Sequence, residues 1–239
     1  MPPLVETAAH SSDGARLRIV DRAWYAYAAR LLPEAAGAGR WLDLGCGQGE
    51  FLELAAARGL AGWGLDYWQR NAAAVLAGGR PALVADLNRP LPFRDASLDG
   101  ASMIEVIEHI VRAESVVAEL ARVIRPQGWL VLTTPNVVHL TYRLRTLTGH
   151  PPKQEGYHVR FFTRKTLGEL LTSAGFRPVG YASFGKQVLL SKLGRLTGKG
   201  PKYKYRYVVP RPFEPLLAQH FVWRLQRGAA AAGEGASGT

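Results

Sequence analysis

Three glycines at alternate positions follow a short apolar run that contains an acid, and together they form a loop suited to binding a ligand. The loop residues are Gly45, Cys46, Gly47 and Gly49. Glycine lets the backbone turn tightly and come close to a ligand that a Cβ atom would exclude. Asp43 stands just before the loop, where its carboxylate would repel a diphosphate and favour a cationic ligand. The pattern predicts a strand over residues 41–44, the loop, and a helix that begins at Glu50.

Two more acidic residues follow the next two predicted strands. Asp66 ends a strand about twenty residues beyond the loop, at the usual place of a ribose-binding acid in Rossmann-type sheets. Asp66 could instead cap the helix that starts near Tyr67, because aspartate is a favoured N-cap residue. Asp86 follows the third strand, and Leu87 is next in the chain. Acids at three successive strand ends would surround one ligand, because such ends share one edge of a parallel sheet.

These features together resemble motif I of the class I S-adenosylmethionine-dependent methyltransferases, whose cofactor carries a sulfonium and an ammonium group. The dinucleotide fingerprint G-x-G-x-x-G would need its third glycine one residue after Gly49. The family phrase l-P-F-x-D-x-S-F-D is matched at residues 91–99 except for Leu98, and the similarity continues through residues 105–110. The resemblance covers residues 20–185 closely and the final strand loosely.

The resemblance implies S-adenosylmethionine as the cofactor and suggests roles for individual residues. In the family, the position of Asp86 holds the adenine amino group, and the next backbone N–H, that of Leu87, lies on the ring. Relatives also have an aromatic-rich helix over the methionine end of the cofactor, so Tyr25 or Tyr27 is expected to hydrogen-bond there. The expected cofactor-binding residues are Asp43, Gly45, Cys46, Gly47, Gly49, Asp66, Tyr67, Asp86, Leu87, Glu105 and Tyr25.

Residues 135–163 interrupt the alternation of strands and helices and should form a roof over the ligand crevice, which lies outside the carboxyl ends of the strands. Phrases at residues 133–139, 143–145 and 156–163 recur together in one branch of the family. That branch includes methyltransferases of surface-glycan and natural-product clusters and methyltransferase-like proteins associated with methionine biosynthesis. The resemblance therefore implies a small-molecule or glycan acceptor.

Methyl transfer to a hydroxyl usually requires removal of its proton, and histidine is the natural base near neutral pH. His158 in the roof and His109 after the fourth strand are the candidate catalytic residues, although a structural role is open for each. Glu105 and Glu108 are alternatives that could equally be solvated or capping carboxylates. The other histidines are given no catalytic role, and they are His10, His139, His150 and His220. No metal ion is expected.

The remaining pattern predicts an α/β fold with a Rossmann-like, seven-stranded, mostly parallel sheet, helices on both faces, and an antiparallel last strand. Helices are expected over residues 21–32, 50–58, 68–76, 112–124, 139–147 and 163–174. Strands are expected over residues 41–44, 61–66, 81–87, 98–104, 129–134, 176–184 and 220–225. The expected organisation is an N-terminal arm (1–20), a single methyltransferase domain (21–227) with a roof insertion (135–163) and a basic insertion (186–211), and a disordered tail (228–239).

Charge is concentrated in the second half of the chain. The net charge is +11, from 30 Lys and Arg against 19 Asp and Glu, and no acid occurs between Glu169 and Glu214. Tyr203, Tyr205 and Tyr207 alternate with basic residues there. Such a stretch could meet nucleic acid, an anionic membrane surface or a lipid-linked acceptor, or it could be a solvated insertion. Charge alone therefore identifies no partner.

The sequence gives no sign of a membrane span or of a disulfide. No apolar run approaches the length of a transmembrane helix, and residues 1–12 carry no basic leader. The single cysteine, Cys46, excludes an internal disulfide and agrees with a reducing compartment. These observations predict a cytoplasmic protein, which could be peripheral to a membrane.

Three functions are compatible with the sequence. The first is an O-methyltransferase acting on a small molecule or glycan. The second is a nucleic-acid methyltransferase, which is disfavoured because Thr134-Pro135-Asn136 reverses the Asn-Pro-Pro-aromatic motif of the amino-directed enzymes. The third is a cofactor-binding partner protein without turnover of its own. Methyl transfer to a panel of acceptors would separate the first from the third.

Overall fold

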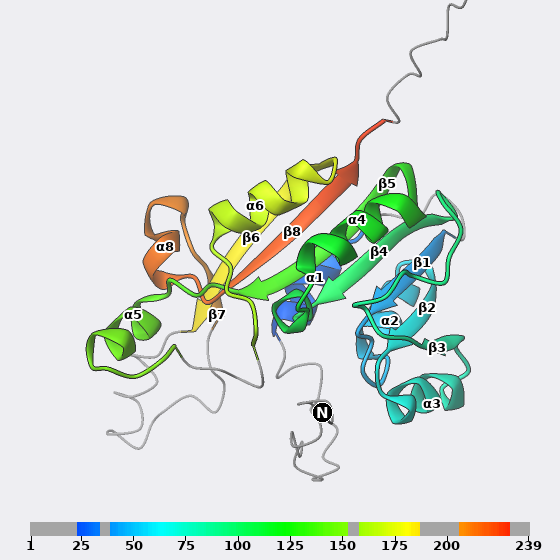
Figure 1. Ribbon diagram of the computed structural model, residues 1–239, viewed down its shortest axis with the longest axis horizontal. Helices are drawn as coiled ribbons and strands as arrows, with labels where there is room; N and C mark the ends of the chain where they lie inside the picture. Colours follow the sequence, from blue (N-terminus) through cyan, green and yellow to red (C-terminus); the bar gives the residue numbers. More distant parts are fainter. Residues whose placement is uncertain (1–22, 34–38, 153–157, 187–205, 230–239) are drawn as a thin grey trace, which may run out of the picture.

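The computed structural model describes residues 23–33, 39–152, 158–186 and 206–229 of the 239-residue chain. Within these residues one sheet has the strand order β3-β2-β1-β4-β5-β8-β6-β7 (Figure 1). The strands are β1 (Arg40–Leu44), β2 (Ala61–Asp66), β3 (Ala82–Val84), β4 (Leu98–Ile104), β5 (Ile124–Pro135), β6 (Phe176–Lys186), β7 (Arg206–Val208) and β8 (His220–Arg227). The α-helices are α1 (Ala23–Arg30), α2 (Glu50–Ala56), α3 (Gln69–Ala77), α4 (Ala113–Val123), α5 (Leu140–Leu147), α6 (Arg164–Ser173) and α8 (Glu214–Leu217). Two 3₁₀ turns are η2 (Ile107–His109) and η3 (Arg211–Phe213).

The first five strands are parallel, and the C-terminal strands add an antiparallel part. β8 pairs antiparallel with β5 on one side and with β6 on the other. The predicted Rossmann-like sheet with an antiparallel last strand is confirmed. The short strand β7, which pairs with the end of β6, was not predicted and lies inside the segment interpreted as the basic insertion.

Apolar helix faces cover both sides of the sheet. One core cluster joins α4 and α6 to the sheet through residues such as Leu120 and Leu171, both inaccessible to solvent. A second cluster joins α1 and α2 to the sheet through Ala28, Phe51 and Trp41. Figure 1 shows α4 and α6 in front of the strands and α1 behind them. The sheet is therefore the middle layer of three.

Local signals in the sequence set some of the element boundaries. Thr163 and Thr166 form a reciprocal capping box that starts α6. The predicted helix over 112–124 ends at Val123, and β5 begins at once, five residues earlier than the predicted strand. Gln127, with a φ of 63°, turns the backbone there, so the start of β5 is irregular.

Several expectations fall on residues that the structure does not describe. These are the arm over residues 1–20, residues 187–205 of the basic insertion, Tyr157 of the roof, and the tail beyond residue 229. In the described part of the chain, none of the helices has the length and apolar character that a membrane crossing requires.

Candidate functional site

The glycine loop connects β1 to α2 at the carboxyl edge of the sheet. Gly45, Gly47 and Gly49 have φ values of +68°, +54° and +92°, a region that residues with a Cβ atom rarely adopt. A Cβ atom on Gly45 would also lie 2.5 Å from Cγ2 of Val106. The loop therefore packs directly against the segment that follows β4, which brings the first and fourth strand ends together.

Backbone hydrogen bonds hold the loop to the end of β2. The N–H groups of Gly45 and Cys46 donate to the Leu65 carbonyl at 2.7 and 3.1 Å. The N–H of Gly47 donates to Oδ2 of Asp66 at 2.9 Å. These three N–H groups are thus hydrogen-bonded inside the protein. They fix the conformation of the loop and are not available as donors to a ligand.

The Cys46 side chain points into the protein. It is 2 % exposed and packs with Leu52 and Val75. Burial raises the pKa of the thiol, and the nearby Asp43 carboxylate raises it further. A thiol held neutral in an apolar cluster is a poor nucleophile, so the environment of Cys46 does not support a nucleophilic role.

Asp43 is a buried carboxylate at the end of β1. Ser102, its register partner on β4, donates its hydroxyl to Oδ1 at 2.5 Å, and Trp41 Nε1 donates to the same serine at 3.0 Å. Burial raises the pKa of Asp43 to about 7, with Glu50 and Asp66 adding to the rise and the Ser102 hydrogen bond opposing it. A cationic group placed beside Asp43 would stabilise its ionised form, as a sulfonium- or ammonium-bearing ligand requires.

Asp66 ends β2 and accepts three hydrogen bonds within the described residues. The donors are the N–H of Gly47, the N–H of Trp68 at 2.8 Å and the side-chain amide of Asn71 at 3.0 Å. Asp66 therefore ties the glycine loop to the start of α3, but the N-cap residue of that helix is Trp68, so Asp66 is not its N-cap. A carboxylate has about four acceptor sites, so these contacts leave room for a ribose hydroxyl. Tyr67, which follows, is 53 % exposed.

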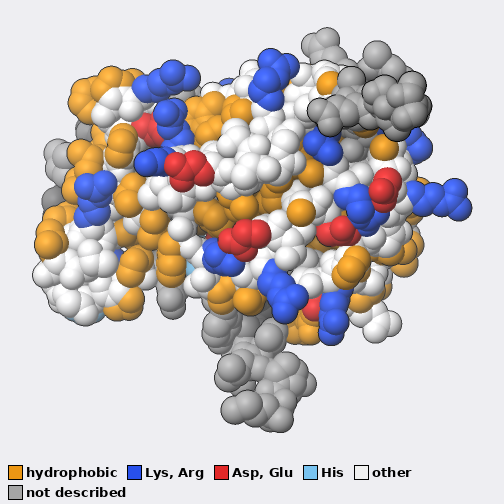
Figure 2. All heavy atoms as spheres, turned by 45° about the horizontal axis from the view of Figure 1, so that its top comes forward, with side chains coloured by type: hydrophobic (Ala, Val, Ile, Leu, Met, Phe, Trp, Pro, Cys, Tyr) orange, Lys and Arg blue, Asp and Glu red, His pale blue; other side chains and the backbone are white. Residues whose placement is uncertain are grey.

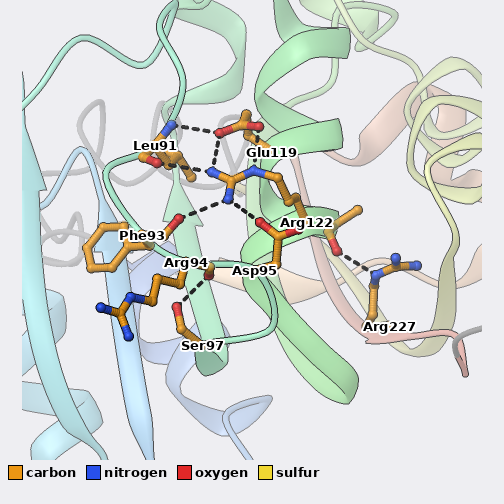
Figure 3. Close-up of polar contacts among 9 residues, drawn as sticks. Leu91, Phe93, Arg94, Asp95, Ser97, Glu119, Arg122 and Arg227 are labelled. Atoms are coloured by element: carbon orange, nitrogen blue, oxygen red, sulfur yellow. Dashed lines mark hydrogen bonds and ion pairs between the residues drawn. The ribbon is translucent and has the colours of Figure 1, made fainter.

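Asp86 and Leu87 begin the loop after β3. Oδ1 of Asp86 accepts both the backbone and the side-chain N–H groups of Asn88 at 2.9 Å, and Leu87 is buried. Figure 3 shows how Arg122 of α4 fixes the rest of this loop. Its guanidinium donates to the carbonyls of Leu91 and Phe93 and to the carboxylates of Asp95 and Glu119, at 2.7–3.0 Å. The family phrase at residues 91–99 thus contains a loop held by one arginine.

Glu105 follows β4 and lies against a histidine from the far end of the chain. Its Oε2 is 2.8 Å from Nδ1 of His220, and its φ is 57°. The His220 ring stacks between Trp24 of α1 and Phe184 of β6, with centroids 5.3 and 5.2 Å apart. The sequence predicted no role for His220. Because β8 is antiparallel, its first residue, His220, pairs with Pro135 at the carboxyl edge. The predicted antiparallel direction of this strand could therefore have placed His220 at the site.

The roof brings the two candidate catalytic histidines together. Val159 and Arg160 donate their backbone N–H groups to the Glu108 carbonyl at 2.9 and 3.0 Å. This places His158 beside His109, with ring centroids 4.8 Å apart and the planes at 71°. The two histidines predicted from separate segments are therefore neighbours.

Glu108 lies beneath these histidines and is not the solvated carboxylate that the sequence allowed. It is 2 % exposed, and Thr134 donates its hydroxyl to Oε2 at 3.1 Å. Burial raises the pKa of Glu108 well above its usual value, and the neighbouring Glu105 carboxylate raises it further. The carboxylates of Glu105 and Glu108 thus lie close together with little solvent, and Glu108 is next to the imidazoles of His109 and His158.

Two other polar side chains of the roof have structural partners. Arg160 donates to the Val111 carbonyl at 2.7 and 3.0 Å and pairs with Glu114 at 2.8 Å, so it fastens the roof to the start of α4. His139 caps α5, where its Nδ1 accepts the N–H of Thr141 at 3.2 Å. Both side chains therefore contribute to holding the roof in place.

A hollow opens between the roof and the ends of β4 and β5. Its walls combine apolar and ionisable side chains, namely Glu108, Pro135, Val137, Tyr142, Pro152, His158, Arg160, Phe161 and Phe162. The glycine loop, Asp43, Asp66 and Asp86 lie along the carboxyl ends of β1, β2 and β3, and the hollow lies beyond β4 on the same edge. The three acids and the ionisable side chains of the hollow thus lie along one edge of the sheet.

Comparisons with known proteins agree with this arrangement. The sequence profile of a methyltransferase domain family matches residues 16–180. A protein of Mycolicibacterium smegmatis described as a "probable S-adenosylmethionine-dependent methyltransferase" is 34 % identical over 136 residues, which are 56 % of this chain and 51 % of that protein. A "ubiquinone biosynthesis O-methyltransferase" of Chromobacterium violaceum is 29 % identical over 152 residues, 56 % of this chain and 62 % of its own.

The fold is also found among solved structures. A SAM-dependent methyltransferase from Archaeoglobus fulgidus superimposes with a TM-score of 0.62 and 20 % identity, covering 87 % of this chain and 94 % of that one. The profile match covers well over half of the chain, so the protein belongs to the class I S-adenosylmethionine-dependent methyltransferases. Within that class it is a member of the methyltransferase domain family matched at residues 16–180, and it spans about half the length of the mycobacterial relatives it matches.

Proposed function

We propose that this protein transfers the methyl group of S-adenosylmethionine to a hydroxyl oxygen of a small-molecule acceptor. The observation that carries the proposal is the hollow beside the strand ends, where Glu108 and His158 meet apolar side chains. In this proposal Asp43 faces the ammonium end of the cofactor, Asp66 the ribose and Asp86 the adenine. The acceptor hydroxyl lies at the group formed by Glu108, His109 and His158.

For this reaction the protein has to align the two reactants and to control the proton of the acceptor hydroxyl. Methyl transfer is an in-line displacement at a carbon activated by the sulfonium, and correct positioning can supply roughly 7–11 kcal/mol of the acceleration. The acceptor hydroxyl must lose its proton as the new bond forms. A cluster of imidazoles and carboxylates at the hollow is suited to that task.

The hollow favours an acceptor that carries a ring or another apolar part. Val137, Phe161 and Phe162 line it, and Phe161 is 44 % exposed. In Figure 2 hydrophobic side chains gather at the end of the molecule where α5 and α8 lie. The ring of a phenol or the apolar face of a sugar would make apolar contacts with such walls. The O-methyltransferase named among the relatives supports oxygen as the acceptor atom.

A panel of acceptors tests the proposal. The purified protein is incubated with methyl-labelled S-adenosylmethionine and phenols, catechols, monosaccharides, lipid-linked sugars or RNA, and label transfer is measured. We expect transfer to a hydroxyl compound. His158→Ala should lose roughly 10²–10⁴-fold in rate while its affinity for S-adenosylhomocysteine stays within twofold. The control His150→Ala changes an exposed histidine of the neighbouring loop and should keep its rate.

Other results would point to the alternatives. Label transferred to RNA alone would favour a nucleic-acid methyltransferase. Tight binding of the cofactor with no transfer to any class of acceptor would favour a partner protein without turnover. A fully active His158→Ala variant would remove the roof histidine from the reaction.

A further inference from the structure

We propose that Glu108, His109 and His158 together bind a divalent transition-metal ion at the wall of the acceptor hollow. One carboxylate oxygen of Glu108 and one ring nitrogen of each histidine all lie within 4.8 Å of one another. Such ligands bind Zn²⁺ at about 2.0–2.2 Å, so two ligands of one ion lie at most about 4.4 Å apart. A small rotation of the imidazoles, neither of which is fully buried, closes the difference.

The three side chains come from two segments that the fold fixes against each other. Glu108 and His109 lie in the 3₁₀ turn η2 after β4, and His158 lies in the roof. Two backbone hydrogen bonds to the Glu108 carbonyl join these segments, and the Arg160–Glu114 ion pair anchors the roof next to them. The ligand atoms are therefore brought together before any ion binds, which lowers the entropy cost of binding.

The buried carboxylate of Glu108 is a second, independent observation that points to a ligand. Its Oε2 accepts the Thr134 hydroxyl, but its Oε1 has no hydrogen-bond partner among the described residues and is shielded from solvent. A buried carboxylate oxygen without a partner is costly. The Glu105 carboxylate, which lies near enough to disfavour ionisation of Glu108, adds to that cost. A cation beside Glu108 would offset both effects.

The donor set indicates the class of ion. Two imidazole nitrogens and one carboxylate oxygen suit the borderline ions from Mn²⁺ to Zn²⁺, whereas Mg²⁺ and Ca²⁺ prefer oxygen ligands throughout. Three protein ligands also leave coordination positions for another molecule. Because Glu108 and His158 line the hollow, those positions would face the acceptor.

The use of the ion rests on the proposed methyl transfer. The acceptor hydroxyl oxygen would coordinate the ion, which lowers the pKa of the hydroxyl, and its proton would pass to water. The oxygen then forms a bond to the methyl carbon while the bond from that carbon to sulfur breaks. The products are the methyl ether, neutral S-adenosylhomocysteine and one released proton. In this scheme His158 is a ligand of the ion rather than the base.

Cation binding is measured first, without any acceptor. Full-length protein is dialysed against a chelator and titrated with Co²⁺ and with Zn²⁺ by calorimetry, and the visible absorption of Co²⁺ reports its ligands. We expect one ion per chain. His109→Ala and His158→Ala should weaken binding by at least tenfold, and the double variant should abolish it. The control His150→Ala should bind as wild type does, and Mg²⁺ should not displace Co²⁺ at equal concentration.

The variants remain informative if Glu108 is needed for folding. Glu108→Gln is the isosteric change at the buried position, and thermal unfolding shows whether it folds. The two histidines are more exposed, so their variants should keep the wild-type melting temperature and can be judged on binding alone. Equal Co²⁺ affinity in wild type and in the folded double variant would overturn the site.

Activity then separates this inference from the proposed function. Chelation should stop transfer in the wild type without changing its affinity for S-adenosylhomocysteine, and Co²⁺ or Mn²⁺ should restore it. An unchanged rate in metal-free protein would overturn the role of the ion and leave O-methylation standing. An ion bound with the expected ligands, but with no hydroxyl acceptor methylated, would leave the site standing and overturn the proposed function.

Discussion

At the scale of single residues, Asp43 carries two opposite effects. Burial makes its ionised form unfavourable in the ligand-free protein, while the proposed cofactor needs that same ionised form. The bound cofactor therefore has to supply the positive charge that stabilises the Asp43 carboxylate. In the proposed function the acid is retained at a cost in stability, and both effects can be measured in one variant.

Asp43→Asn should stabilise the ligand-free protein at pH 8. The pKa is about 7 in the folded protein and 3.8 in the unfolded chain, so only the folded protein stays protonated between these values. The free energy of unfolding of the wild type therefore falls as pH rises from 3.8 to 7, by up to about 4 kcal/mol. Asparagine can still accept the Ser102 hydrogen bond and does not titrate. Urea unfolding at pH 4 and pH 8 should show the gain mainly at pH 8.

The same variant should bind S-adenosylhomocysteine more weakly, because its neutral amide cannot pair with the ligand's ammonium. For the wild type, affinity should decrease as pH falls below about 7, since the Asp43 carboxyl then has to release a proton on binding. A stability difference that is equal at both pH values would contradict the buried-acid explanation.

Asp66→Ala should weaken binding of S-adenosylhomocysteine by roughly ten- to hundredfold, from the loss of about 1.5–3 kcal/mol of charged hydrogen bonds. Part of the loss comes from the glycine loop, because the N–H of Gly47 loses its acceptor. Asn71→Ala is the matched control, since it removes one donor to the same carboxylate and leaves both main-chain contacts in place. Calorimetry that finds wild-type affinity in Asp66→Ala would exclude the ribose role.

At the scale of elements, α1 joins the two ends of the chain. Tyr25 packs on Phe51 of α2 with ring centroids 5.8 Å apart, and Tyr27 stacks on Phe184 of β6 at 4.8 Å. His220 of β8 also stacks between Trp24 and Phe184. The helix α1 therefore packs both on α2, which follows the glycine loop, and on the antiparallel strands. It is part of the core as well as a candidate cover for the cofactor.

Removing α1 should therefore damage both stability and cofactor binding. Deleting residues 1–20 should spare affinity for S-adenosylhomocysteine, while deleting residues 1–30 should weaken it and lower the melting temperature. Tyr25→Phe keeps the packing on Phe51 and removes only the hydroxyl, so a loss of affinity at unchanged stability would locate the proposed hydrogen bond. Equal affinity for the two truncated proteins would refute a covering role.

At the scale of the whole molecule, β8 holds the sheet together. It pairs with β5 over Trp129 to Pro135 on one side and with β6 over Phe176 to Phe184 on the other. Its inward residues, such as Phe221 and Leu225, are buried. The strand nearest the C-terminus thus lies inside the sheet, next to the strands that form the site.

A protein that ends at residue 185 should fail to fold, because β5 and β6 would lose their common partner and expose unpaired backbone groups. A protein that ends at residue 229 keeps β8 and is the control, with an unchanged melting temperature. Circular dichroism and S-adenosylhomocysteine titration compare the two. Native affinity in the shorter protein would show that the parallel part is independent.

The sequence by itself determined the parallel half of the sheet, the glycine loop and the acids at its strand ends, because each depends on residues close together in the chain. Glycine spacing, apolar runs and helix-ending prolines act locally, and Asp43, Asp66 and Asp86 followed from them. Only the tertiary structure decided which distant groups meet. The register of β8 placed His220 beside Glu105, and two backbone bonds to Glu108 set His158 beside His109, since contacts between segments far apart depend on packing that no local pattern encodes.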